Sequence, residues 1–104
     1  MHSIVQQVER WFGEACPKLS QTFTKVNFLL MHAQDGVRGK VTIQVDGASV
    51  GATITFWNKG DVEAIGLDKE KKQEFSFDDR VLTADDDVPS LLKSYFDRLS
   101  VLEG

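Results

Sequence analysis

A tryptophan followed closely by acids is the feature of this chain best suited to binding. Trp57 stands just before the turn Asn58-Lys59-Gly60, and Asp61 and Glu63 alternate along the segment that returns from it. Tryptophan is enriched among the residues that dominate protein interfaces, and carboxylates complement a basic surface. Two interpretations stay open: Trp57 anchors a protein contact, or it packs as a lid over the far side of a sheet.

The sequence contains no recognisable set of residues for nucleophilic catalysis. Such catalysis needs a nucleophile, a base and an orienting group in one place. The histidines His2 and His32 fall at the N-terminus and near the end of a predicted strand, and no visible arrangement of charges activates the single cysteine, Cys16. We therefore expect the protein not to be an enzyme, and we assign no catalytic residue.

Two acidic runs raise the question of a metal site, because Ca²⁺ and Mg²⁺ prefer oxygen ligands. Neither Asp78-Asp79 nor Asp85-Asp86-Asp87 has the alternating spacing and final glutamate of an EF-hand loop. Helix capping and a solvated loop explain these runs better. The glycines are scattered among predicted turns and strands, so they form no phosphate-binding loop. We predict no metal and no cofactor.

Charge is unevenly distributed along the chain. The formal net charge is −4; residues 61–104 hold twelve acidic against six basic residues, whereas residues 1–60 hold four against six. The acidic C-terminal part argues against nucleic-acid binding, which needs a basic footprint. It is compatible with a basic protein partner. The alternative is that the acids only provide solubility.

Length and composition indicate a single domain, residues 1–104, in the cytoplasm. A chain of 104 residues is just large enough for one modest core. A lone cysteine forms no internal disulfide, which favours a reducing compartment. The first residues lack the basic and apolar regions of a signal peptide. The longest nearly apolar run, 26–31, is far shorter than the roughly 20 residues that cross a bilayer, so we predict no membrane association.

The N-terminal segment has the pattern of an amphipathic helix. Ser3 and Gln6 form a capping-box signature at its start. Pro17 is expected to stop or kink the helix near Ala15 or Cys16. The apolar residues that recur at helical spacing are Ile4, Val8, Trp11, Phe12, Ala15 and Leu19.

The middle of the chain predicts about five strands, and the short loops between them make the pairing antiparallel. Residues 22–33 carry apolar side chains on both faces, so we expect them to form a central strand covered on both sides. Asp46-Gly47 is a hairpin signal because the tight turn needs positive φ. The predicted strands are residues 22–33, 37–46, 50–57, 61–67 and 73–78.

A second amphipathic helix is predicted to follow the acids at 85–87, which can cap its free amides and complement its dipole. Two amphipathic helices that flank a meander indicate an α+β layer structure, with both helices on one face of the sheet. The apolar stripe of the second helix comprises Val88, Leu92, Tyr95, Leu99 and Leu102, and is widened by Leu91 and Phe96.

A succession of short motifs covers most of the chain. Residues 53–63 read T-I-T-F-W-x-x-G-x-x-E, an acid-rich turn and a short aromatic strand come next, and a helix with paired leucines ends the chain. This succession resembles the TriTu immunity family of bacterial polymorphic toxin systems. The residues that carry the resemblance beyond 53–63 are Trp11-Phe12, Asp68-Lys69-Glu70, Phe75, Phe77, Leu91-Leu92, Phe96 and Leu99.

The resemblance implies a small bacterial protein of the cytoplasm that binds a cognate toxin domain and neutralises it without being an enzyme. From the exposed face of the predicted sheet and its acids, we infer a contact set that comprises Trp57, Asp61 and Glu63, with Asp68, Asp78 and Asp79 as an outer acidic rim. The alternative function is a small acidic secretion chaperone that dimerises through its C-terminal stripe and binds an effector. Monomer and homodimer both stay open.

Overall fold

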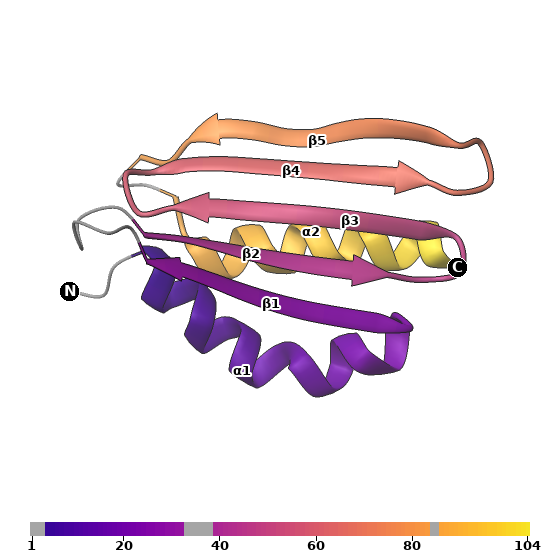
Figure 1. The fold of residues 1–104 in the computed structure, drawn as a ribbon, viewed down its shortest axis with the longest axis horizontal. Helices are drawn as coiled ribbons and strands as arrows, with labels where there is room; N and C mark the ends of the chain where they lie inside the picture. The colour runs from indigo at the N-terminus through magenta and orange to yellow at the C-terminus, as the bar shows by residue number, and fades with distance from the viewer. Residues whose placement is uncertain (1–3, 33–38, 84–85) are drawn as a thin grey trace.

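The chain folds into two layers, a sheet of five strands and a pair of helices behind it (Figure 1). The computed structural model describes residues 4–32, 39–83 and 86–104. The predicted α+β class, the antiparallel meander and the helix at each end are confirmed. The elements are α1 (Ile4–Thr22), β1 (Lys25–His32), β2 (Gly39–Asp46), β3 (Val50–Trp57), β4 (Asp61–Asp68), β5 (Gln73–Val81) and α2 (Val88–Glu103).

The strands follow one another across the sheet in chain order, and every neighbouring pair is antiparallel. Because each strand of a meander pairs only with its neighbours in the chain, β1 and β5 are the edges. The prediction that residues 22–33 form a central strand covered on both sides is therefore wrong. Leu29 and Met31 of β1 are 48% and 55% exposed.

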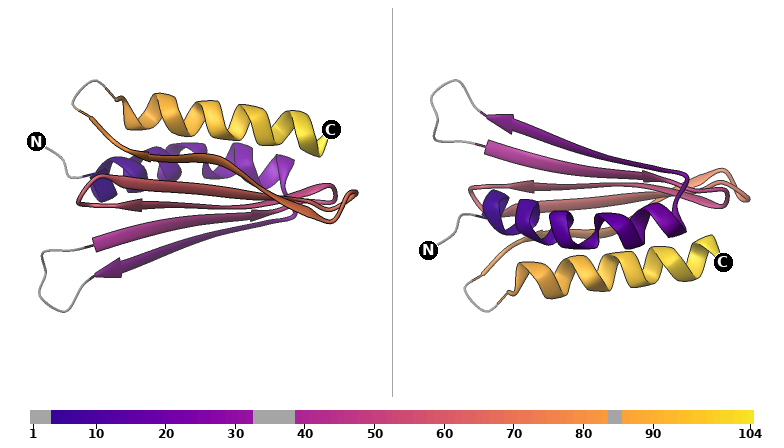
Figure 2. Two further views of the ribbon diagram at one scale, coloured as in Figure 1. Left: turned by 90° about the horizontal axis from the view of Figure 1, so that it is seen from above. Right: turned by 90° about the horizontal axis from the view of Figure 1, so that it is seen from below.

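The face of the sheet that carries the helices forms the hydrophobic core with them (Figure 2). Strand residues alternate between buried and more exposed positions, as the two-residue period of a strand requires. Phe56 of β3, Val8 of α1 and Leu92 of α2 are all fully buried. The helices also contact each other, since Trp11 stacks on Phe96 with 5.4 Å between ring centroids.

Helix α1 passes through Pro17 and ends at Thr22, so of the two expected effects, a stop or a kink, the stop near residue 15 or 16 does not occur. A proline inside a helix costs about 3 kcal/mol, because it removes one hydrogen bond and its ring crowds the preceding turn. Burial compensates here. Leu19 and Phe23, just past the proline, are 6% and 2% exposed, and the Phe23 N–H donates to the Leu19 carbonyl at 2.8 Å.

The start of each helix makes a hydrogen bond outside the regular helical pattern. Ser3 and Asp85 lie outside the described residues. The Val5 N–H near the start of α1 donates to Asn58 Oδ1 at 3.0 Å, so a residue distant in sequence supplies the acceptor. Asp87 occupies the N-cap position of α2 but makes no side-chain cap bond; it accepts from the Ser90 hydroxyl at 2.6 Å instead.

The end of α2 is joined to the turn between β2 and β3. The Glu103 carboxylate accepts hydrogen bonds from the backbone N–H groups of Ala48 (2.8 Å), Ser49 (2.8 Å) and Val50 (3.1 Å). The bond from Ser49 and its two neighbours lower the pKa of Glu103. Gly47 leaves the room for this contact, because a Cβ at that position would overlap the carboxylate. The turn thus holds the helix to the sheet.

Candidate functional site

Among the described residues, no second layer covers the face of the sheet opposite the helices (Figures 1 and 2). We call it the open face. Cross-strand register places Trp57 beside Lys40 of β2, which in turn pairs with Met31 of β1. Thr55, in the next row, lies opposite Glu63 of β4. The open face is thus apolar and basic toward β1, and acidic toward β4 and β5.

A hollow of about 350 Å³ lies at one end of the open face, around the turn between β3 and β4. The turn places Trp57, the last residue of β3, next to Asp61, the first residue of β4. Trp57 is partly buried on this face, and its ring forms part of the wall of the hollow. The residues that line the hollow are Trp57, Lys59, Asp61, Val62, Glu63 and Asp79.

Two of these acidic residues lie opposite each other on neighbouring strands, and neither has an ion-pair partner among the described residues. Glu63 and Asp79 are Cα partners on β4 and β5. Among the described residues, only Asp61 of the hollow's acids has an ion-pair partner, Lys59, at 3.0 Å. That pair is largely exposed and contributes little stability. Because like charges directly opposite each other destabilise a sheet, a cation placed between Glu63 and Asp79 would be favourable.

The turn that carries Trp57 is held at several points. Asn58 accepts the Val5 N–H described above, which attaches the turn to α1. Gly60, with φ of 115°, closes the turn by donating its N–H to the Trp57 carbonyl at 2.9 Å. The Gly60 carbonyl accepts the Leu82 N–H at 2.8 Å. A fixed turn presents the indole in one place, which lowers the entropy lost on binding.

Asp78 was predicted to belong to the outer acidic rim, but it lies on the helix side of the sheet. Its carboxylate accepts hydrogen bonds from the Tyr95 hydroxyl of α2 and from Arg80 Nε at 2.9 Å. Burial by itself would raise the pKa of Asp78; the bonds from Tyr95 and Arg80 outweigh it, and the pKa is lowered. Since consecutive strand residues point to opposite faces, Asp78 and Asp79 cannot share one surface.

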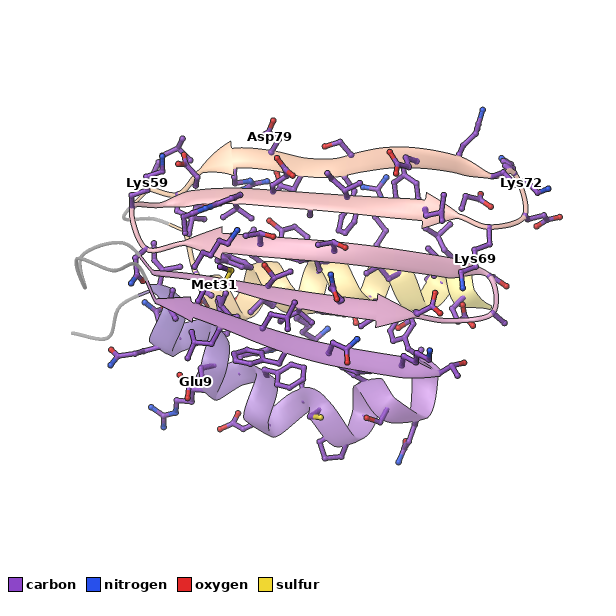
Figure 3. All side chains as sticks on the ribbon, in the orientation of Figure 1. Glu9, Met31, Lys59, Lys69, Lys72 and Asp79 are labelled. Carbon is purple, nitrogen blue, oxygen red and sulfur yellow. The ribbon has the colours of Figure 1, made fainter. Side chains whose placement is uncertain are left out.

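Asp68 is also separated from the hollow. It ends β4, whereas Asp61 begins it, and seven residues of strand span about 23 Å. Asp68 Oδ1 accepts the Lys71 N–H at 3.1 Å and so stabilises the turn before β5. Figure 3 shows the two ends clearly, with Lys59 at one end of the sheet and Lys69 at the other. Of the predicted contact set, the structure gathers Trp57, Asp61, Glu63 and Asp79.

Two exposed apolar residues lie in the row of Trp57. Met31, on β1, and Val81, the last residue of β5 opposite Asp61, are 55% and 65% exposed. They flank Trp57 across the width of the sheet. Sequence reasoning missed Val81, because the predicted strand ended at residue 78 and only the register between strands aligns Val81 with Trp57.

The described residues hold no group of three or more His, Cys, Asp or Glu side chains that could bind a metal ion. In the same part of the chain, no helix is long and apolar enough to cross a membrane. The chain matches no protein-family model, no curated protein and no solved structure. The resemblance to the TriTu immunity family therefore stays a prediction.

Proposed function

We propose that this protein is an immunity protein, which binds a bacterial toxin domain in the cytoplasm and neutralises it through the hollow beside Trp57. The observation that carries the proposal is the position of Trp57 beside Glu63 and Asp79, which are Cα partners and have no ion-pair partner among the described residues. Like charges placed opposite each other in a sheet repel. A basic side chain of the partner would relieve this repulsion and lie against the indole, which attracts cations through its ring face. Binding, not catalysis, is what these groups support.

The partner surface that fits is basic at its centre and apolar around it. Met31 and Val81 lie on either side of Trp57 and remain exposed in the isolated chain. An aromatic anchor flanked by apolar contacts and charges is typical of protein interfaces. A toxin that acts on nucleic acid is one class with such a basic surface, because phosphate binding requires it.

The test is co-expression with the toxin domain encoded beside this gene. The unmodified protein should restore growth and bind the purified toxin domain, and Trp57→Ala should weaken binding at least about 30-fold, the loss typical of an interface hot spot. Glu63→Lys should weaken it too, and more strongly at low salt. Gln44→Ala is the matched control, since Gln44 lies on the same face two strand rows from Trp57. Unchanged binding by Trp57→Ala and Glu63→Lys would exclude this surface.

The secretion chaperone was predicted to dimerise through the apolar stripe of the C-terminal helix. In the structure Val88, Leu92 and Leu99 are 3%, 0% and 0% exposed, because they fill the core of their own chain. Only Leu102 of that stripe reaches the surface substantially, at 43%. The buried stripe does not favour the chaperone. Light scattering tests the point directly, because such a chaperone is a stable dimer.

A further inference from the structure

The two edges of the sheet differ in how they meet solvent. Strand β5 carries charges along its length and a register shift opposite Ala64 and Ile65, two features that discourage pairing with another strand. Strand β1 has a continuous register with β2 over eight residues. Lys25, at the start of β1, is charged, whereas residues 26–31 carry no charge. The β1 edge therefore lacks the run of charges and the register shift that β5 carries.

The direction of the free backbone groups of β1 follows from the ladder beside it. At the start of β2 the Gly39 carbonyl accepts the Asn58 N–H at 2.9 Å, so the odd-numbered residues of β2 direct their backbone groups toward β3. Successive residues of an antiparallel strand alternate in this respect. Thr42 therefore bonds to β1, where it lies opposite Leu29. The β1 residues whose N–H and C=O groups point away from the sheet are Val26, Phe28 and Leu30.

Apolar side chains accompany this edge on both faces. Leu29 and Met31 are exposed on the open face, and Leu30, on the helix side, is 37% exposed. Phe28 stacks on Phe12 of α1, with 4.8 Å between ring centroids. Free backbone groups flanked by apolar side chains match an extended segment of chain, which supplies both hydrogen bonds and side chains.

The position of helix α1 restricts which kind of segment can pair with β1. Figure 1 shows α1 projecting past β1, beyond the edge of the sheet, and the view from below in Figure 2 agrees. A strand added to β1 would extend the sheet beneath this helix. If two copies paired through β1, their two α1 helices would lie over a pair of strands that are only about 4.8 Å apart. A helix is at least 10 Å wide with its side chains, so the second copy would collide.

We propose that β1 binds an extended, apolar segment of another protein as an additional edge strand. The backbone groups of Val26, Phe28 and Leu30 form the ladder, and the segment's side chains on the helix side pack against α1. No residue of β1 lines the hollow beside Trp57, although Met31 borders both surfaces. The inference does not depend on the immunity function, since it rests on the edge alone.

Amide hydrogen exchange tests the proposal on the whole protein. The probe is a synthetic peptide with the sequence of residues 39–46, because this strand already pairs with β1 from its other side. In the free protein the amides of Val26, Phe28 and Leu30 should exchange fast, and the peptide should slow them at least about tenfold. A peptide of residues 73–80, which is rich in charge, is the control and should give no protection.

Three outcomes of the exchange experiment would overturn the proposal. The first is that the three amides already exchange slowly in the free monomer. The second is that the peptide does not slow their exchange, and the third is that it slows the exchange of β5 amides instead. Protection that grows with protein concentration, together with a dimer in sedimentation, would show that a second copy occupies the edge and would equally contradict the inference.

A proline substitution separates backbone pairing from side-chain contact. Leu30→Pro removes an N–H that points to solvent, a position that edge strands tolerate, and should abolish peptide binding while the fold remains. Leu30→Ala keeps this N–H and should retain most of the binding. Leu29→Pro removes an N–H that bonds to β2 and should lower the melting temperature. Equal peptide binding by Leu30→Pro and the unmodified protein would refute backbone pairing, and the exchange measurement decides if Leu30→Pro does not fold.

Discussion

Phe56 and Trp57 are neighbours in β3, yet they belong to opposite faces of the sheet and to different kinds of surface. Phe56 is fully buried beneath the helices. Trp57, one residue later, is partly buried on a face that has no second layer and forms a wall of the acidic hollow. Two aromatic residues of similar chemistry thus differ in role because only one face of the sheet is covered. The covered face holds the fold together, and the open face is available for binding.

The same division separates Asp78 from Asp79. Asp78 bonds to Tyr95 and Arg80 on the covered side, while Asp79 faces Glu63 on the open side. The Asp78 carboxylate is stabilised by its partners, whereas Asp79 has no ion-pair partner among the described residues. Charge alone therefore does not tell which acid supports the fold and which one contacts a partner.

The largest expected effect comes from removing the buried aromatic ring. Phe56→Ala should lower the free energy of unfolding by about 3–5 kcal/mol, because it leaves a cavity in a close-packed core. Urea denaturation followed by circular dichroism measures the change. The whole free energy of unfolding of such a domain is roughly 5–15 kcal/mol. A loss below about 1 kcal/mol would mean that the helix-covered face does not form the main core.

The acid on the helix side of the sheet, Asp78, should have the next largest effect. Asp78→Ala leaves the Tyr95 hydroxyl, in a residue only 5% exposed, without its acceptor. We expect a loss of about 1–3 kcal/mol, the cost of an unsatisfied buried polar group. Asp79→Asn is the matched control; it removes one of two facing charges and should leave the stability unchanged or slightly higher. Similar losses in both variants would remove the distinction between the two faces.

The stability that Glu103 contributes at the end of α2 should depend on pH. The backbone hydrogen bonds, first that from Ser49, lower the pKa of Glu103 below the usual value of 4.5 for a glutamate. The carboxylate therefore contributes stability above pH 4.5, and this contribution is lost as the pH falls through the lowered pKa. Glu103→Gln should be less stable than the unmodified protein at pH 7, and the gap should narrow below pH 4.5. Urea midpoints at several pH values measure it, and a constant gap would contradict the assignment.

The smallest effect on stability is expected on the open face. Trp57→Ala should lower the free energy of unfolding by only about 1 kcal/mol, because the indole is already partly exposed and burying a large apolar side chain is worth roughly 1.5–3 kcal/mol. The same variant should lose most of the toxin binding described above. A loss of stability as large as that of Phe56→Ala would identify Trp57 as a packing lid and not as an anchor.

Local patterns in the sequence are enough to predict most of the fold. Alternation along β2 and β3, the Asp46-Gly47 turn and the helical spacing of both ends led to the correct order of elements. The helix does not stop near Pro17, because the local cost of the proline is offset by the burial of Leu19 and Phe23, which lie past it. The central placement of residues 22–33 was wrong because an apolar strand at an unprotected edge has the same composition as a buried one.

By itself, the sequence determined the α+β class, the meander and the alternation along β2 and β3, because these depend on short-range periodicity and turn chemistry. The tertiary structure alone decided which face the helices cover, which acids meet Trp57, and where the edges lie. Those properties depend on register between strands and on packing between distant segments, such as Glu103 with the β2–β3 turn and Asn58 with α1. A linear pattern cannot specify such contacts, since each joins residues more than fifty positions apart.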